Sequence, residues 1–505
     1  MKIAFVNGPY EHLGVGYISA VLKEKGYETR LFCDPRLFDD NIVSLKPLAR
    51  FFDLKARLIS ELKAYRPDLI GFSVMTDDYQ WACTLAKMIK QEMDVPVIFG
   101  GNHPTAVPDR VIRNDSVDIV CVGEGEYPML ELVQSMAKGA ADTSIKNLWF
   151  KKDGRVIANE VRPLIEDLDA LPFPDKDLYY KVSPHFRKAY SIAASRGCFF
   201  SCSFCWHSYY SRLYKGKGMP VRTRSVASVL DELSRAKERS WLSDLGFVDD
   251  CFGHDPAWLK LFSQQYRQAI GKRFMCIMDP RHVSPEVVGY LKDACCGEIM
   301  LGIQSLEPEV KDKVMNRKVS MEQMAQAIRL IKGSKITIAV DNIFGLPGQD
   351  VDEFMRSLLF YVPVRPDRIL FYTLKYYPLI DVTLFARQNG YLSDEKFEAI
   401  MEGRDAGGLC VDSFLDKRGD PPNVFRGVRN FLAVFDCLPG KAIRFIIEKK
   451  KYRSFLGFLN PAILFIVRTL FATDSDSVYM KATACSRYFY FTKCLFIFKL
   501  RKACR

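Results

Sequence analysis

The chain has 505 residues, 48% of them hydrophobic and 26% charged, which predicts a globular protein of two or three domains, because a single core does not grow to this size. The chain has fifteen cysteines, and its first residues have the pattern of a strand and not of a signal peptide. These two observations exclude a disulfide scaffold and favour a cytoplasmic protein with free thiols. The net charge is +12, and residues 441–505 alone carry 14 Lys/Arg against 3 Asp/Glu. The nearly neutral remainder excludes a nucleic-acid groove through the body of the protein.

Residues 1–140 alternate short apolar runs with helical patterns. Strands are expected at 3–6, 29–33, 69–74, 95–99 and 118–122, and helices near 14–25, 53–65, 79–92, 107–113 and 127–137. This alternation predicts an α/β domain with a doubly wound parallel sheet. Such sheets bind ligands at the carboxyl ends of their strands, where the loops open. The candidate ligand-binding residues in those loops are Asn7, Gly8, Met75, Thr76, Gly100, Gly101, Asn102, His103, Glu124 and Gly125.

Residues 141–185 change in character and are expected to connect two domains. Residues 149–157 predict a hairpin with a turn at Asp153-Gly154, because Asp-Gly suits the tight turn between two antiparallel strands. A proline-rich connector follows at 171–174.

A second alternation of strands and helices occupies residues 186–395. Strands are expected at 190–194, 244–249, 273–278, 298–304, 336–343 and 368–374, and helices near 224–239, 256–269, 284–292, 320–332 and 350–360. Six consecutive strand–helix units predict a partial parallel barrel. Residues 396–505 are expected to form a mostly helical, basic and apolar C-terminal region.

Three cysteines in the spacing C-x3-C-x2-C stand at the start of this second alternation: Cys198, Cys202 and Cys205. A closed zinc site or an ordinary cubane cluster takes four protein ligands, and the next cysteine along the chain is Cys251. The triplet therefore predicts a [4Fe–4S] cluster with one iron open to a small molecule. A zinc knuckle or a set of structural thiols is the alternative.

With Phe204 before its last cysteine, the triplet resembles the signature loop of the radical S-adenosylmethionine (radical SAM) enzymes. The run 100–105, followed about twenty residues later by Gly123-Glu124-Gly125-Glu126, is similar to the N-terminal module of the cobalamin-dependent radical SAM enzymes. The resemblance covers residues 1 to 395. It implies a flavodoxin-like cobalamin (B12)-binding domain followed by a partial (β/α)6 radical SAM barrel.

Three further segments at strand ends, 247–250, 302–305 and 342–348, resemble the family's SAM-binding motifs. Family members often have Glu where this chain has Gln304, and residues 378–384 depart from the family's Pro-Gly-Thr-Pro-Leu segment. The resemblance implies SAM contacts from Phe204, Asp249, Asp250, Gln304, Ile343 and Gly345, and cobalamin contacts from the ten loop residues of the first domain.

The cobalamin motif Asp-x-His-x-x-Gly is absent from the chain, because the glycine after His12 falls at the wrong offset. We therefore expect no protein imidazole on cobalt. His12 is expected to be a solvated loop residue, and His103 to be a packing or cofactor-tail contact.

The resemblance implies three cofactors: a [4Fe–4S] cluster, SAM and cobalamin. The reduced cluster, supplied with electrons by a donor such as flavodoxin or ferredoxin, would cleave SAM to a 5′-deoxyadenosyl radical, and the enzyme would methylate an unactivated carbon of a small-molecule or lipid-like substrate. Oxidation or cyclisation by the same two domains is an alternative, as is loss of cobalamin from the first domain. A zinc- or redox-sensing binding protein is the alternative of another class.

The C-terminal region contains two apolar runs, 455–471 and 488–498, which are interrupted by residues such as Pro461, Arg468 and Lys493. Neither run is long enough to span a bilayer. The basic cluster 449–453 beside the first run predicts a helix lying on an anionic membrane, the inner face of the cytoplasmic membrane. The alternative is a helical cap that packs on the barrel.

Overall fold

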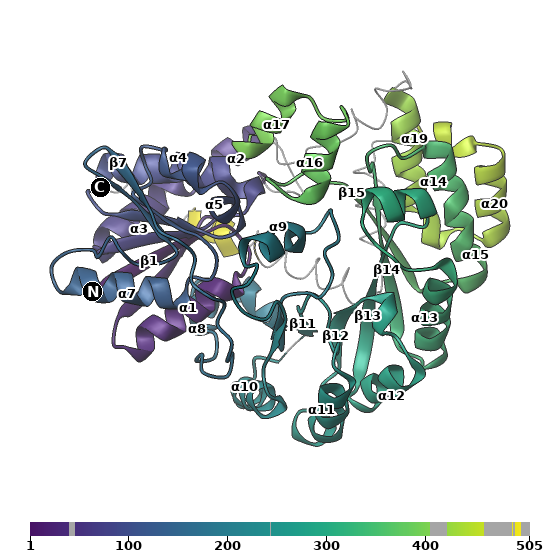
Figure 1. Ribbon diagram of the computed structural model, residues 1–505, viewed down its shortest axis with the longest axis horizontal. Coiled ribbons are helices and arrows are strands. Elements are labelled where there is room, and N and C mark those ends of the chain that lie inside the picture. Colours follow the sequence, from purple (N-terminus) through teal and green to yellow (C-terminus); the bar gives the residue numbers. More distant parts are fainter. Residues whose placement is uncertain (40–45, 243, 405–421, 459–486, 488–489, 496–505) are drawn as a thin grey trace.

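The computed structural model describes residues 1–39, 46–242, 244–404, 422–458, 487 and 490–495. Two α/β domains lie side by side, each built on its own sheet (Figure 1). The predicted fold class is confirmed, and each predicted strand is present with its ends shifted by at most two residues.

The first sheet has the strand order β2-β1-β3-β4-β5-β6-β7, and its first five strands are parallel. The order 2-1-3-4-5 is the flavodoxin-like one, whose ligand site lies at the carboxyl ends of the strands. The strands are β1 (Lys2–Asn7), β2 (Glu28–Cys33), β3 (Leu69–Ser73), β4 (Val97–Gly100) and β5 (Ile119–Cys121). The helices are α1 (Leu13–Glu24), α2 (Lys46–Phe51), α3 (Lys55–Tyr65), α4 (Tyr79–Glu92), α5 (Asn102–Ala106), α6 (Pro108–Ile112) and α7 (Glu126–Ala137).

The predicted hairpin is present as β6 (Leu148–Lys152) and β7 (Arg155–Ala158), with Asp153 and Gly154 in its turn. Its first strand pairs antiparallel with β5. The hairpin therefore extends the first sheet and is not a separate linker element. Only the segment after it, with α8 (Asp177–Tyr180) and a short 3-10 turn η2 (Pro184–Lys188), connects the two domains.

The second sheet has the order β15-β14-β13-β12-β11-β8, and all six of its strands are parallel. Its two edges, β8 and β15, do not pair with each other, as expected of a partial barrel. The strands are β8 (Ala189–Ile192), β11 (Asp244–Phe247), β12 (Phe274–Met278), β13 (Cys296–Gln304), β14 (Thr337–Phe344) and β15 (Arg368–Thr373). The outer helices are α10 (Val226–Glu238), α11 (Pro256–Ala269), α12 (Pro285–Asp293), α13 (Met321–Gly333), α14 (Val351–Ser357) and α15 (Tyr361–Val364).

Helix starts in the barrel follow from local sequence. Ser225, Asp255, Ser284 and Asp350 each accept a hydrogen bond from an amide of the first turn, and Ser320 forms a capping box with Gln323. Each cap satisfies an amide that has no partner within the helix. The predicted helix boundaries in the barrel are therefore close to the observed ones.

The two domains share hydrophobic cores. Leu346, Leu374, Ile380 and Phe397 from the barrel side belong to one buried cluster with Phe99 of the first sheet. Helices α16 (Asp381–Gln388) and α17 (Asp394–Met401) supply much of this contact, and in Figure 1 they lie across the space between the domains. Because this contact is apolar and continuous, it holds the strand ends of the two sheets opposite each other.

The described C-terminal residues are helical, as predicted. They form α19 (Pro422–Ala433), α20 (Gly440–Glu448) and the 3-10 turns η6 (Phe435–Cys437) and η7 (Lys451–Ser454) beside β15 and α14. Phe491 and Leu495 pack instead on the first domain, against Leu37 and Leu54. Most of the apolar runs 455–471 and 488–498 lies outside the described residues. No described helix is long and apolar enough to cross a membrane.

Candidate active site between the two sheets

The three cysteines lie on a loop between the short strand β9 (Ser195–Arg196) and helix α9 (Trp206–Leu213). Cys202 is buried, and Cys198 and Cys205 are partly exposed. The Arg317 guanidinium lies 3.5 Å from the Cys202 sulfur and is itself held 2.8 Å from Asp279. A fixed positive charge beside a thiol stabilises its ionised form, which is the form that binds metal.

Burial raises the pKa of the Cys198 thiol to about 11 and that of Cys205 to about 12. Bound metal would offset this penalty, because thiolate ligands lose their protons on coordination. In the part of the chain that the structure describes, no three His, Cys, Asp or Glu side chains converge as ligands of a single metal ion, as a closed zinc site requires. A cubane cluster holds its thiolates on separate iron atoms, and the three cysteines of this loop would leave one iron without a protein ligand.

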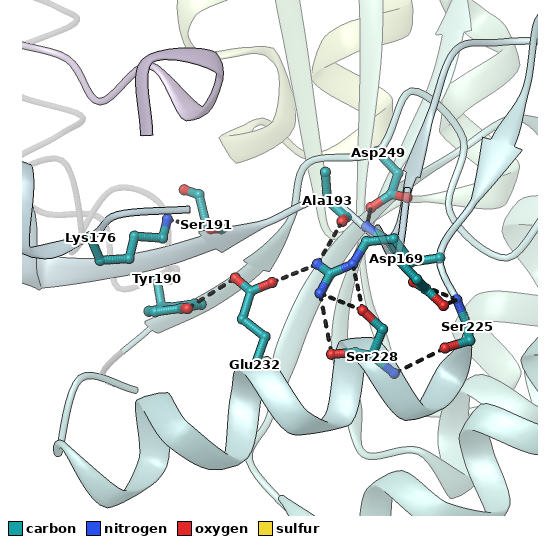
Figure 2. Close-up of polar contacts among 11 residues, drawn as sticks. Asp169, Lys176, Tyr190, Ser191, Ala193, Ser225, Ser228, Glu232 and Asp249 are labelled. Carbon is teal, nitrogen blue, oxygen red and sulfur yellow. Dashed lines mark hydrogen bonds and ion pairs between the residues drawn. The ribbon is translucent and has the colours of Figure 1, made fainter. Parts of the chain in front are cut away.

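A buried polar network holds the chain just before the cysteine loop (Figure 2). Tyr190 donates a hydrogen bond of 3.0 Å to Glu232, whose other oxygen lies 2.5 Å from Arg224. Arg224 in turn donates to the carbonyl of Ala193 over 3.3 Å. Each side chain of this network has a hydrogen-bond partner within it. A buried polar network fixes the path of the backbone under this condition.

Asp249, a predicted SAM contact, takes part in the same region. It is 2% exposed, and its two carboxylate oxygens accept hydrogen bonds from the Ala194 amide over 3.1 Å and from the Ser195 hydroxyl over 2.5 Å. Burial raises its pKa to about 6. Within the chain this carboxylate therefore positions the backbone that leads to Cys198.

Of the other predicted SAM residues, Phe204 lies on the cysteine loop itself, and the rest lie at the carboxyl ends of β11, β13 and β14. Asp250 is half-exposed and lies 2.8 Å from the ring of His207, two residues after the last cysteine. Gln304 has a φ of 71° at a register shift between β13 and β14, a conformation that costs free energy for a residue with a side chain. Ile343 and Phe204 are partly buried. Gly345 has a φ of 81°, in the left-handed region that favours glycine.

A cavity of 460 Å³ lies between the strand ends of the first sheet and the cysteine loop. On the barrel side it is lined by Trp206, His207, Tyr210 and Asp250. Of the ten residues predicted to contact cobalamin, those that line it are Gly100, Gly101, Asn102, Glu124 and Gly125. Those that do not line it are Asn7, Gly8, Met75, Thr76 and His103.

Inside the first domain, this cavity extends along the sheet between α1 and α7, where Phe5, Ile98 and Met129 line it. Glycine keeps this part open: a Cβ on Gly71 would lie 3.3 Å from the Phe5 ring, and one on Gly125 would lie 3.0 Å from Ile18. A narrow apolar slot that opens onto polar loops fits a large cofactor with a flat apolar part, so these residues fit cobalamin.

The carboxylate of Glu124 accepts hydrogen bonds from several groups of the protein itself. One oxygen accepts hydrogen bonds from Arg222 over 2.8 Å and from Arg196 over 3.2 Å, and the other accepts from the Ile165 amide over 2.9 Å. Arg196 also lies 2.7 Å from Glu126. Glu124 and Glu126 of the first domain therefore form ion pairs with Arg196 and Arg222, the two arginines that flank the cysteine loop. These four residues are here called the clamp.

A second contact beside this clamp involves Tyr214, at the end of α9. Its hydroxyl accepts a hydrogen bond of 3.2 Å from the Glu124 amide. A Cβ on Gly123 would lie 1.8 Å from the same hydroxyl, so only glycine allows this approach. Sequence reasoning missed Arg196, Arg222 and Tyr214; the signal available was a pair of arginines on either side of the cysteine loop.

The environment of His103 was predicted correctly, and that of His12 was not. His103 is fully buried, its ring lies 4.2 Å from that of Tyr79, and burial lowers its pKa to about 3. It packs in the core, as expected. The prediction that His12 is a solvated loop residue is wrong, because its ring is partly buried within 2.9 Å of the Ser73 hydroxyl and burial lowers its pKa. Neither ring lines the cavity.

Comparisons with known proteins agree with this arrangement. The family model of the B12 binding domain matches residues 3–133, and that of the Radical SAM superfamily matches residues 192–361. The uncharacterized methyltransferase PH0819 of Pyrococcus horikoshii is 26% identical over 77% of this chain and 81% of its own length. The anaerobic magnesium-protoporphyrin IX monomethyl ester cyclase of Rubrivivax gelatinosus is 24% identical over 70% of this chain and 64% of its own length.

Among solved structures, the cobalamin-dependent S-adenosylmethionine radical enzyme OxsB, with aqua-cobalamin and S-adenosylmethionine bound, has a TM-score of 0.65 and 16% identity, and the match covers 95% of this chain and 74% of that one. At this identity the likeness shows the fold. Together with the two family models, it accounts for both sheets in their observed order. The chain belongs to the family of radical SAM enzymes that carry a B12-binding domain ahead of the radical SAM domain.

Proposed function

We propose that the protein is a cobalamin-dependent radical SAM methyltransferase that methylates a carbon atom of a small-molecule substrate. One observation carries the proposal. The cavity of 460 Å³ has the strand ends of the B12-binding domain on one wall and, on the other, Trp206, His207 and Tyr210 of the helix that directly follows the cluster cysteines. A single cavity thus adjoins both candidate cofactor sites, as methyl transfer to a substrate radical requires.

Cys198, Cys202 and Cys205 would hold a [4Fe–4S] cluster. Asp250, Gln304, Ile343 and Gly345 would hold SAM, and Gly100, Gly101, Asn102 and Gly125 would hold cobalamin. When bound, these groups supply the radical and the methyl group. The chain's own residues place them: Arg317 holds its positive charge beside Cys202, and the apolar core shared by the two domains holds the two walls of the cavity opposite each other.

Oxidation or cyclisation of the substrate is the second candidate function. The similarity to the Rubrivivax cyclase favours it, because that relative matches over both domains. Either function needs a one-electron donor, such as flavodoxin or ferredoxin, to reduce the cluster.

The test is a substrate-free turnover of protein reconstituted anaerobically with iron, sulfide and hydroxocobalamin, reduced and supplied with SAM that carries a labelled methyl group. A methyltransferase is expected to transfer label to the corrinoid fraction and to release S-adenosylhomocysteine. Formation of 5′-deoxyadenosine with no label in the corrinoid fraction would favour the second candidate. Protein that takes up zinc but no iron or sulfide would overturn both.

We also propose peripheral contact with an anionic membrane through the described part of the tail. Helix α20 buries Ile443 and Ile447 on the barrel side, while Phe445 is 56% exposed and follows the exposed cations Lys441 and Arg444 on the same helix. An exposed aromatic side chain among cations suits a headgroup surface. The helical cap and the membrane surface, treated above as alternatives, are compatible as two faces of one helix.

A further inference from the structure

Two guanidinium groups lie beside Cys202, the buried cysteine of the triplet. That of Arg317 lies 3.5 Å from the cysteine sulfur, and that of Arg281 interacts with the same sulfur. The side chain of Arg317 is 4% exposed and that of Arg281 is 18% exposed. Arginine keeps its positive charge at any pH at which a protein is folded. Two fixed cations therefore adjoin the most deeply buried ligand of the proposed cluster.

One carboxylate, that of Asp279, holds both arginines in place. Its two oxygens accept hydrogen bonds from Arg281 over 2.7 and 2.8 Å, and Arg317 lies 2.8 Å from one of them. Burial by itself would raise the pKa of Asp279, but the two arginines outweigh burial and lower this pKa below its usual value. The carboxylate is therefore ionised at neutral pH, and two positive charges and one negative charge lie together beside the cysteine loop.

The backbone around Arg317 is bonded directly to the cysteine loop. Arg317 follows the π-helical turn η4 (Val310–Val314). At the end of this turn, the carbonyl of Met315 accepts a hydrogen bond of 3.0 Å from the Ser203 amide. The Val314 carbonyl accepts one of 2.5 Å from the hydroxyl of the same serine. Because Ser203 directly follows the buried cysteine, these bonds fix the guanidinium relative to the sulfur.

Arg281 reaches the loop from the end of another strand. It lies in the short 3-10 turn η3 (Pro280–His282) after β12, where Asp279 also accepts a hydrogen bond of 3.0 Å from its amide. The guanidinium carbon lies 3.3 Å from the centroid of the Phe200 ring, and Phe200 lies between the first two cysteines of the triplet. A cation over an aromatic ring is a favourable contact, so this second arginine is also held against the loop.

Charges in this position bear on the reduction of a cluster. One-electron reduction, with the electron supplied by the donor protein, adds one negative charge to the cluster and makes or breaks no bond. Hydrogen bonds and positive charge at the sulfurs stabilise the more negative state and so raise the reduction potential. A buried carboxylate acts in the opposite sense. Both effects are larger in a buried site than in water, because the effective dielectric constant there is lower.

A further carboxylate, that of Asp250, acts on the other two cysteines, Cys198 and Cys205. Its side chain is 44% exposed and lies 2.8 Å from the ring of His207. Solvent screens an exposed charge more than a buried one. The buried arginines and their carboxylate are therefore the stronger fixed influence on the charge of the cluster.

We propose that Arg317, Arg281 and Asp279 set the reduction potential of the [4Fe–4S] cluster, the two arginines raising it and the aspartate lowering it. The inference rests on the proposed function and deepens it by naming the residues that control how readily the donor reduces the cluster. They are positioning residues, because they act through the ligand sulfur and do not touch the substrate. A network with a structural role alone would not shift the potential in opposite directions when charges of opposite sign are removed.

The test is an anaerobic potentiometric titration of the full chain reconstituted with iron, sulfide and hydroxocobalamin, without SAM, with the EPR signal of the reduced cluster as the readout. Arg317→Met is expected to favour the oxidised cluster about tenfold, which lowers the midpoint potential by ~59 mV. Arg281→Met should lower it by less, because this arginine is more exposed. Asp279→Asn should raise it. Arg317→Lys keeps the charge and an N–H donor, and should stay closer to the parent than Arg317→Met.

Arg368→Met is the matched control. The side chain of Arg368 is 8% exposed and lies 3.6 Å from Glu298, so this variant also removes a buried, paired cation. Arg368 is the first residue of β15, at the opposite end of the sheet from the cysteine loop, and its loss should leave the potential unchanged. Equal shifts in Arg317→Met and Arg368→Met would overturn the inference. A shift in the same direction in Arg317→Met and Asp279→Asn would also overturn it.

The same samples separate this inference from the proposed function. Iron and sulfide contents and transfer of the labelled methyl group are measured alongside the titration. If the parent holds no iron–sulfur cluster, the proposed function is wrong. If the parent holds a cluster and transfers the label while the variants keep its potential, only this inference is wrong. If Arg317→Met fails to load a cluster, Arg281→Met and Asp279→Asn still test whether the two signs of charge shift the potential in opposite directions.

Discussion

Glu124 in the B12-binding domain accepts a hydrogen bond of 2.8 Å from Arg222, on the strand that closes the cysteine loop. Both side chains are buried: that of Arg222 is 4% exposed and that of Glu124 is 10% exposed. Arg196, two residues before the first cluster cysteine, contacts the same carboxylate. The backbone on either side of the cluster loop is thus tied to the cobalamin-side loop, which couples the relative position of the two cofactor sites.

Glu124→Gln is expected to destabilise the protein by about 3–5 kcal/mol, because removing one partner of a buried ion pair leaves an uncompensated charge. The measurement is the free energy of unfolding by urea, with hydrogen exchange of residues 195–222 to locate the loosened segment.

Glu131→Gln provides the matched control for this substitution. Glu131 forms a two-point pair with Arg162 at 2.9 and 2.8 Å, but it is 45% exposed and does not contact the cluster loop. An exposed pair contributes about 0–1 kcal/mol. Equal losses in the two variants would show that the clamp stabilises the fold no more than a surface pair does.

Replacing Cys198, Cys202 or Cys205 by Ala should leave the fold intact and remove SAM cleavage, because thiolates are the strong iron ligands in this loop. Cluster absorption at roughly 400 nm reports the cluster directly. Cys251→Ala is the control, since this buried cysteine lies outside the triplet, and it should keep the absorption. The ligand assignment is wrong if Cys251→Ala bleaches the protein and Cys202→Ala does not.

His12→Ala and His103→Ala should each leave the spectrum of bound cobalamin unchanged. Neither ring lines the cavity, and each is engaged elsewhere, His12 with Ser73 and His103 with Tyr79. A shift in either variant to the spectrum of a different axial ligand would show that the imidazole binds cobalt.

His103 should also make the stability of the first domain depend on pH. Burial lowers its pKa from 6.5 to about 3, so the unfolded chain binds a proton there before the folded one does. The contribution of His103 to stability is therefore complete above pH 6.5 and declines as the pH falls toward 3. Between pH 7.5 and pH 5 the loss is about 2 kcal/mol.

The measurement is urea unfolding followed by tryptophan fluorescence at these two pH values. His103→Phe keeps an aromatic ring beside Tyr79 and should show a pH dependence smaller by about this amount. An unchanged pH dependence in the variant would mean that the folded-state pKa of His103 is close to its usual value.

The tail should bind vesicles that contain an anionic lipid such as phosphatidylglycerol and release them in ~0.5 M salt, because salt screens charges at a surface. Lys441→Glu with Arg444→Glu should abolish co-sedimentation, whereas Lys260→Glu with Lys272→Glu on and after α11 should not. Truncation of the chain at Asp436 is a less specific test, because it also removes the buried Tyr452, whose hydroxyl donates a hydrogen bond to Asp352. Equal sedimentation of both double variants would leave the tail as a cap on the barrel.

The positions of the strands and helices followed from local pattern. Apolar runs of four to six residues between helical stretches predicted β1 to β5, and serine and aspartate caps set the starts of the barrel helices. The spacing of Cys198, Cys202 and Cys205 predicted a single loop, because three ligands within eight residues stay together in any fold. Signals of this kind depend on neighbours a few positions away, and the tertiary structure did not alter them.

The environment of individual side chains was decided by tertiary structure. Glu124 was predicted to contact cobalamin, and the residue that engages it most closely, Arg222, is 98 positions further along the chain. His12 was predicted to be solvated, and the fold brings it, just before α1, within 2.9 Å of Ser73 at the end of β3. The hairpin was predicted from its own residues, whereas its pairing with β5, which makes it part of the first sheet, was not. Composition and periodicity determined which segments form strands, helices and the cluster loop, whereas contacts between distant segments exist only after the two cores have packed together.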